Sequence, residues 1–182
     1  MTFPVLGFAG QIGAGKSTIS TLVADALNGP RVAFGDHVRS VARQRGIETS
    51  RESLQILGED LVCKDCREFC RAVLMQANWQ QGQLLIVDGI RHLQVLCELR
   101  RIVHPQRFLL VFINVDNSTR RIRVESRASD DSTRVNQFDG HATEVQVKDL
   151  VRQEADLVVN GSLPPVEIMR EIVTWVRYQS MI

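Results

Sequence analysis

The sequence predicts an α/β protein in which helices cover both faces of a five-stranded parallel sheet. Short apolar runs alternate along the chain with stretches that repeat apolar residues at the spacing of a helix. Strands separated in this way by helices are typical of a parallel sheet that is buried on both faces. We see no internal repeat and no low-complexity tract, so residues 1–182 are expected to form one domain.

The strands are expected where the apolar runs are short, at residues 5–9, 32–34, 84–87, 108–115 and 157–159. The helices are expected between them, at residues 16–27, 37–45, 53–62, 66–77, 93–103, 119–128, 143–153 and 165–178. In the first helix, apolar residues at 19, 22, 23, 26 and 27 form one face. Thr49 or Ser50 can cap the third helix, His104-Pro105 ends the fifth, and Pro164-Pro165 opens the last.

Composition and charge narrow the class of protein. Hydrophobic residues make up 44% of the chain and charged residues 24%, and the formal net charge is only +1. Proteins that bind nucleic acid usually carry a basic excess, so we expect no nucleic-acid partner. No apolar run approaches the roughly 20 residues of a membrane span, and the start of the chain lacks a basic leader. We therefore expect no membrane partner and a cytoplasmic location.

A glycine-rich stretch, GFAGQIGAGKST, lies between the first expected strand and the first expected helix. It matches G-x-x-x-x-G-K-[ST] in the strand–loop–helix context that this motif requires. Its glycines let successive backbone N–H groups point into one concavity, and the helix start adds positive potential there. The alternative is a glycine turn that only joins strand to helix. The residues expected to bind the phosphates of a nucleotide are Gly10, Gly13, Ala14, Gly15, Lys16, Ser17 and Thr18.

The motif indicates a three-layer P-loop NTPase fold and assigns expected cofactors. Lys16 would reach the β- and γ-phosphates, Ser17 would ligate Mg²⁺, and Thr18 would lie near the α-phosphate. A GTPase would usually carry an N-K-x-D element for reading the base, and none occurs in the chain. ATP and Mg²⁺ are therefore the expected cofactors.

Two further polar segments follow expected strands. Asp36 and Arg39 come after the second strand, and Asp88 and Arg91 come after the third. The carboxyl ends of parallel strands face a common ligand crevice, so Asp88 is expected to hold Mg²⁺ or orient an acceptor. Asp36 is expected to hydrogen-bond the hydroxyl or phosphate region of an acceptor. Arg39 and Arg91 are expected to bind the acceptor phosphate, since the guanidinium fork suits phosphate oxygens. Helix N-caps for the aspartates and surface ion pairs for the arginines remain the alternatives.

Arginines crowd the expected helix that follows the fourth strand. Arg123 and Arg127 are expected to contact the transferring phosphoryl group, and the polar segment 128–142 is expected to form a small lid with the arginine stretch, over about 120–142. A closed lid would exclude the water that otherwise hydrolyses the donor. A solvated helix face and an ordinary surface loop are the alternatives.

These segments resemble the P-loop nucleotide kinase superfamily over nearly the whole chain. FGDHVRSVA (34–42) is similar to the G-D-x-[LM]-R segment of adenylate kinases, and VDGIRHLQ (87–94) resembles their D-G-[FY]-P-R segment with one residue fewer. RVESR (123–127) resembles their lid entry. ADLVVNGS (155–162) looks like a dephospho-CoA kinase segment, and SRESLQILGEDLV (50–62) is similar to deoxynucleoside monophosphate kinases of phage type.

The resemblance implies an ATP-dependent kinase that transfers the γ-phosphoryl group to a nucleoside monophosphate-like acceptor. Residues 36–80 would then form the acceptor-binding helical region, and the catalytic residues would be Lys16, Asp36, Asp88, Arg123 and Arg127. A dephospho-CoA-like acceptor and a non-kinase ATP-binding regulator remain alternatives. The expected partner is a small phosphorylated molecule, and the sequence leaves the oligomeric state open.

Four cysteines could serve a metal site or the core. Cys63, Cys66 and Cys70 share one helical face, and Cys97 brings the number to four, enough for zinc. However, thiolates on one helix seldom close a tetrahedron, and buried packing is the commoner use of cysteine. We therefore expect packing residues.

Overall fold

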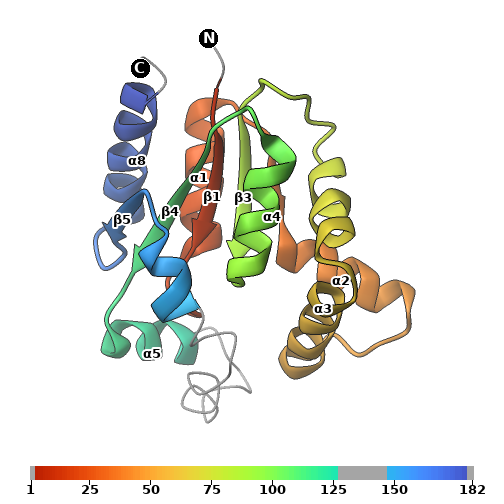
Figure 1. Ribbon diagram of the computed structural model, residues 1–182. Helices are drawn as coiled ribbons and strands as arrows, with labels where there is room; N and C mark the ends of the chain where they lie inside the picture. The colour runs from red at the N-terminus through yellow and green to blue at the C-terminus, as the bar shows by residue number, and fades with distance from the viewer. Residues whose placement is uncertain (1–2, 127–146, 180–182) are drawn as a thin grey trace.

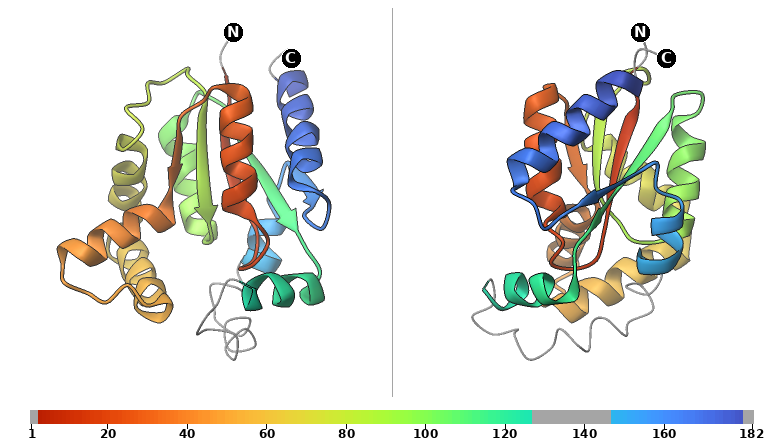
Figure 2. Two further views of the ribbon diagram at one scale, coloured as in Figure 1. Left: turned by 180° about the vertical axis from the view of Figure 1, so that it is seen from behind. Right: turned by 90° about the vertical axis from the view of Figure 1, so that its left-hand side faces the viewer.

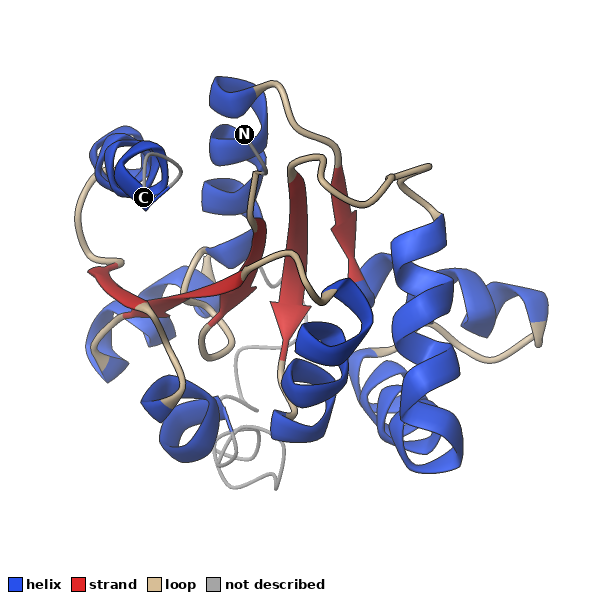
Figure 3. Ribbon diagram, turned by 45° about the horizontal axis from the view of Figure 1, so that its top comes forward, coloured by secondary structure: helices blue, strands red, loops and turns tan. Residues whose placement is uncertain are grey.

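A parallel sheet of five strands organises the computed structural model, which describes residues 3–126 and 147–179. The strands are β1 (Val5–Ala9), β2 (Arg31–Ala33), β3 (Leu85–Ile90), β4 (Phe108–Asn114) and β5 (Leu157–Asn160). All adjacent pairs are parallel and the order is β2-β3-β1-β4-β5 (Figure 3). The five-stranded parallel sheet expected from the apolar runs is thus confirmed.

Two helices cover one face of the sheet. They are α1 (Lys16–Leu27) and α8 (Pro165–Gln179), which lie side by side in front of the strands when the molecule is seen from behind (Figure 2, left). Ile19 and Val23 of α1 meet Ile168 and Ile172 of α8 in an apolar core with the sheet. The amphipathic spacing in each helix therefore accounts for its position.

The opposite face is covered by α3 (Arg51–Met75), α4 (Leu93–Val103) and a short π-helical turn (Val147–Val151). Leu96 and Leu99 of α4, Cys70 of α3 and Val147 of the turn belong to one buried core on that side. The remaining helices, α2 (Phe34–Gln44) and α5 (Asn117–Glu125), lie near the carboxyl end of the sheet (Figure 1). Helices on both faces of one sheet give the predicted three layers.

Two expected boundaries are wrong in ways that affect the site. Phe34 begins α2 instead of ending a strand, so α2 starts three residues before the expected His37. Asp88 lies inside β3 and not after it, because β3 continues to Ile90 through a bulge against β1. The boundary between the two helices expected at 53–62 and 66–77 is confirmed, because α3 breaks at Asp65, whose backbone is extended.

Some expectations fall partly or wholly outside the described residues. These are the lid segment 128–142, Arg127, and the first residues of the helix expected at 143–153. Within the described part of the chain, no helix combines the length and apolarity that a membrane crossing needs.

Candidate functional site

The loop between β1 and α1 has the backbone conformation that its glycines predict. Gly10, Gly13 and Gly15 all have positive φ, at 148°, 83° and 86°. A Cβ on Gly10 would lie 2.6 Å from the carbonyl oxygen of Ile113, so a larger residue has no room beside β4. Glycine at this position is therefore required by both backbone conformation and space.

Lys16 folds back over this loop. Its Nζ donates hydrogen bonds to the carbonyl oxygen of Gly10, at 2.6 Å, and to that of Gln11, at 2.9 Å. The ammonium group thus lies against the loop, while Ser17 and Thr18 are exposed at the start of α1. A cation, hydroxyls and a helix N-terminus come together here. These groups are favourable for binding the negatively charged oxygens of a polyphosphate.

Arg120 of α5 supports the loop from the other side. It is buried, with 2% of its surface exposed. Its Nε donates to the carbonyl oxygen of Ile12 at 2.9 Å, and its Nη1 donates to Oδ1 of Asn117 at 2.9 Å. Among the clustered arginines, Arg120 is therefore placed to hold the loop and α5 together.

Arg123, one turn further along α5, is the expected lid-entry residue that the structure brings near the loop. Its Nη1 lies 3.7 Å from the position that a Cβ on Gly15 would occupy. Asp116 fixes the start of the helix, because its carboxylate accepts from the backbone N–H of Thr119 at 2.8 Å and from the hydroxyl of Ser162 at 3.2 Å. Hydrogen bonds from Ser118, Thr119 and Ser162 lower the pKa of Asp116 well below its usual range.

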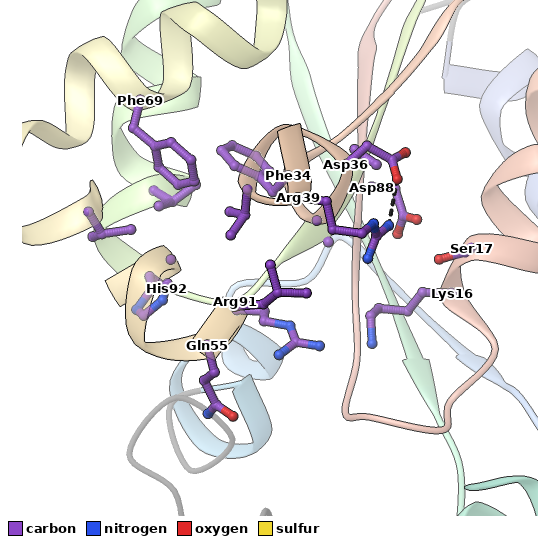
Figure 4. Close-up of a pocket in the computed structure, with 18 of the residues that line it drawn as sticks. Lys16, Ser17, Phe34, Asp36, Arg39, Gln55, Phe69, Asp88, Arg91 and His92 are labelled. Atoms are coloured by element: carbon purple, nitrogen blue, oxygen red, sulfur yellow. Dashed lines mark hydrogen bonds and ion pairs between the residues drawn. The ribbon is translucent and has the colours of Figure 1, made fainter. Parts of the chain in front are cut away.

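A cavity of about 810 Å³ opens beside the loop. Figure 4 shows Lys16 and Ser17 on one side of it, Asp36, Arg39 and Asp88 close by, and Arg91 and His92 further along. The structure therefore brings these two P-loop residues and four expected acceptor-side or metal-side residues to one cavity. Its lining from α2 and α3 includes Val38, Arg39, Leu54, Gln55, Gly58, Glu59, Val62 and Phe69.

The far wall of the cavity is aromatic and apolar. The rings of Phe34 and Phe69 are tilted against each other with centroids 5.1 Å apart. Leu54 and Val62 add aliphatic surface, and Gln55 adds an amide from the same helix. A ligand with a flat, largely apolar part and an anionic part matches this division of the lining.

Asp36 and Arg39 form an ion pair in the structure. Arg39 Nη2 lies 2.5 Å from Asp36 Oδ1, and the two side chains are 46% and 56% exposed. This exposed contact matches the surface ion pair that was the alternative for Arg39. Both residues nevertheless line the cavity.

Arg31 was not predicted as a site residue. Its Nε donates to Ser20 Oγ at 2.8 Å, its Nη2 donates to Asp88 Oδ2, and its Nη1 lies 4.0 Å from Asp36 Oδ2. A single arginine at the edge of an apolar strand was the only signal in the sequence, and two of its partners, Ser20 and Asp88, come from other segments of the chain. Arg31 lines the cavity together with Lys16 and Asp88.

Asp88 and Ser17 fit a divalent cation. Asp88 is 3% exposed, and its Oδ1 is buried without a hydrogen-bond partner among the described residues. Carboxylate and hydroxyl oxygens are the hard donors that Mg²⁺ prefers, and Mg²⁺ beside a nucleotide takes its other ligands from phosphates and water. The two oxygen donors therefore suit a magnesium ion that arrives with a nucleotide.

The cysteines form no metal site in the described part of the chain. No group of three or more His, Cys, Asp or Glu side chains in residues 3–126 and 147–179 is arranged to hold a metal. Cys66 and Cys70 are buried against α4, where desolvation by burial raises the pKa of each thiol. Cys66 and Cys70 therefore act as small apolar packing residues, as expected. The same expectation is wrong for Cys63 and Cys97, which are exposed.

Solved structures of small-molecule kinases share this fold. Over 98% of the chain, the structure matches a gluconokinase from Sinorhizobium meliloti, with a TM-score of 0.62 at 17% identity and 95% of that chain covered. It matches a shikimate kinase from Acinetobacter baumannii over 100% of this chain and 97% of that one, with a TM-score of 0.64 at 14% identity. At these identities the likeness concerns the fold.

Sequence comparison identifies the family. Residues 6–144 match the family model described as AAA domain, and the chain belongs to this family. It is also 27% identical over 128 residues to a UPF0200 protein of Methanothrix thermoacetophila, covering 70% of this chain and 69% of that protein. A UPF0200 protein of Hyperthermus butylicus is 30% identical over 132 residues, with 69% and 67% covered.

Proposed function

We propose that the protein is an ATP-dependent kinase for a small phosphorylated acceptor of the nucleoside monophosphate type. The observation that carries the proposal is the single cavity in which the phosphate loop and an arginine-bearing acceptor wall meet. Phosphoryl transfer depends mainly on alignment and on neutralising charge on the phosphate oxygens, so two adjoining anion sites are what the reaction needs.

The residues divide between the two substrates. The loop with Lys16 binds the ATP phosphates, and Ser17 and Asp88 hold the Mg²⁺ that accompanies them, neutralising charge when bound. Arg39 and Arg91 bind the acceptor phosphate, and Phe34 and Phe69 pack against its flat part. An acceptor oxygen then bonds to the γ-phosphorus as the bridging P–O bond of ATP breaks and ADP leaves.

The test is an acceptor panel with ATP and Mg²⁺, containing nucleoside and deoxynucleoside monophosphates, dephospho-CoA and water alone. We expect a phosphorylated monophosphate whose formation matches ADP release, measured by ³¹P NMR and chromatography. Transfer only to dephospho-CoA would move the assignment to that acceptor. Hydrolysis that no acceptor stimulates would contradict the kinase and favour an ATP-binding regulator.

Lys16→Ala serves as the control, because it removes the ammonium group beside the loop carbonyls and leaves the core intact. Transfer should be lost while the circular dichroism spectrum stays that of the wild type. Turnover near the wild-type rate would show that the observed activity does not come from this loop.

A further inference from the structure

We propose that Arg31 is a positioning residue that fixes the Asp88 carboxylate so that one oxygen remains available to the divalent cation of the nucleotide. The inference rests on the proposed function, since it assigns a supporting partner to that site's metal-binding carboxylate. Arg31 lines the same cavity and contacts Asp88 Oδ2 through Nη2, so it acts on the carboxylate and its role does not require contact with ATP or acceptor.

The sheet register explains why Arg31 reaches Asp88. In the β2–β3 pair, Arg31 lies opposite Ile86 and Ala33 lies opposite Asp88. Side chains two positions apart share one face of a strand, so Arg31 and Asp88 are diagonal neighbours across the two strands. A diagonal neighbour is within reach of a long side chain, and arginine is long enough to use it.

The guanidinium group makes two hydrogen bonds and a longer ionic contact, in which Nη1 lies 4.0 Å from Asp36 Oδ2. Its Nε donates to the buried Ser20 Oγ of α1 at 2.8 Å, and its Nη2 donates to Asp88 Oδ2. The Arg31 side chain is 21% exposed and that of Asp88 only 4%. A planar fork with fixed donor directions, anchored at Ser20, therefore sets the rotation of the carboxylate.

This arrangement leaves the second carboxylate oxygen for a ligand. Asp88 Oδ1 has no hydrogen-bond partner among the described residues, and Asp88 lines the cavity beside Lys16 and Ser17. A buried acceptor without a donor is costly, so its persistence points to a ligand that satisfies it. Partners that orient a ligating carboxylate typically affect metal affinity by 10- to 100-fold when they are removed.

The experiment measures metal binding directly. Mn²⁺ replaces Mg²⁺, and its dissociation constant is determined by electron paramagnetic resonance titration in the presence of a non-hydrolysable ATP analogue. For Arg31→Gln we expect Mn²⁺ binding roughly 10- to 100-fold weaker than in the wild type. Binding of the analogue without metal should change less than about twofold, since Arg31 does not touch the loop. Arg31→Lys keeps the charge without the fork and should give an intermediate value.

Two further variants separate positioning from folding. Ser20→Ala removes the anchor while keeping Arg31, and it should weaken Mn²⁺ binding in the same direction by a smaller factor. Arg100→Gln is the matched control, because Arg100 pairs with Glu154 at 2.5 Å in another part of the molecule. It should lower thermal stability without changing Mn²⁺ affinity.

The outcomes distinguish the two proposals. If the wild type binds no Mn²⁺ with the ATP analogue, the proposed function itself is contradicted. If the wild type binds the pair and Arg31→Gln binds Mn²⁺ equally or more tightly, only the role of Arg31 is overturned. Should Arg31→Gln not fold, unchanged Mn²⁺ affinity in Ser20→Ala overturns it as well.

Discussion

Arg39 illustrates how a side chain can have one partner in the free protein and another with substrate. It pairs with Asp36 through a 2.5 Å contact at the exposed mouth of the cavity. Ion pairs this exposed contribute little, so an acceptor phosphate can replace Asp36 at small cost. The ion pair therefore holds the Arg39 guanidinium beside the cavity while leaving it able to exchange Asp36 for a phosphate.

We predict that Arg39→Ala weakens acceptor binding far more than ATP binding. Losing a charged hydrogen bond to phosphate should cost about 1.5–3 kcal/mol, which is roughly a 10- to 100-fold rise in the acceptor dissociation constant. Calorimetric titration of acceptor and of an ATP analogue measures both. Arg43→Ala, an exposed arginine of the same helix outside the cavity lining, should change neither. Equal weakening of the two ligands by Arg39→Ala would contradict an acceptor-side role.

Residue-scale prediction from sequence succeeded where a position is tied to a local motif. The loop glycines have the positive φ that the motif requires. Arg31 escaped prediction because its importance depends on strand register and on Ser20 and Asp88, which lie 11 and 57 positions away. No local pattern encodes such pairings.

At the scale of elements, α2 and α3 pack through a histidine. The His37 ring lies 5.7 Å from that of Phe69, and its Nδ1 is 2.6 Å from the amide nitrogen of Gln76. In its neutral form the ring can accept this hydrogen bond at Nδ1. Burial lowers the pKa of His37 below its usual 6.5. The folded protein therefore favours the neutral ring.

This shift predicts acid sensitivity of the α2–α3 contact. The unfolded chain takes up the His37 proton at higher pH than the folded one, so the stabilisation is present above pH 6.5 and is lost as pH falls through the lower folded value. We expect the wild type to lose more thermal stability between pH 7.5 and 5.5 than His37→Gln does. Melting curves of both at the two pH values test this, and parallel losses would contradict it.

Element boundaries were predictable only where a sequence signal marks them. Ser50 caps α3, accepting from the backbone N–H of Ser53 at 3.3 Å, and this cap was one of two expected from sequence. The break at Asp65 also agrees with the two separate helical patterns at 53–62 and 66–77 in the sequence. By contrast, β3 runs past Asp88 because its pairing with β1 extends it to Ile90. Pairing of this kind depends on the neighbouring strand and cannot be predicted from the sequence of β3 alone.

At the scale of the whole molecule, two apolar cores lie on opposite faces of the sheet. The number of strands and the three layers followed from the alternation of apolar runs and helical patterns. The strand order β2-β3-β1-β4-β5 did not, because every strand is apolar and could pair with several others.

The core under α8 should control stability without affecting the site. Ile168 is fully buried, whereas Val166 on the same helix is 45% exposed. Ile168→Ala is expected to lower the free energy of unfolding by about 2–5 kcal/mol, because it removes buried methyl groups and leaves a cavity. Val166→Ala is the control and should change it by less than about 0.5 kcal/mol. Urea unfolding measures both.

Affinity for the ATP analogue should be unchanged in Ile168→Ala at temperatures where the variant is folded, since α8 contributes nothing to the cavity lining. A large loss of affinity in the folded variant would show that this core and the site are coupled.

The break in α3 separates two tasks within one helix. Before Asp65 the helix gives Leu54, Gln55 and Glu59 to the cavity, whereas after it Cys70, Val73 and Leu74 are buried in the core. Leu57 before the break is also buried in that core, and Val62 and Phe69 belong to both the core and the cavity lining. The second part also has its own start, because Asp65 Oδ1 accepts from the backbone N–H of Glu68 at 2.9 Å. Substitutions at Gln55 and Glu59, which line the cavity without being buried in the core, can therefore alter ligand preference with less effect on folding than substitutions at Cys70 or Val73. The polar, cavity-lining positions before the break are thus a suitable region in which to redesign ligand specificity.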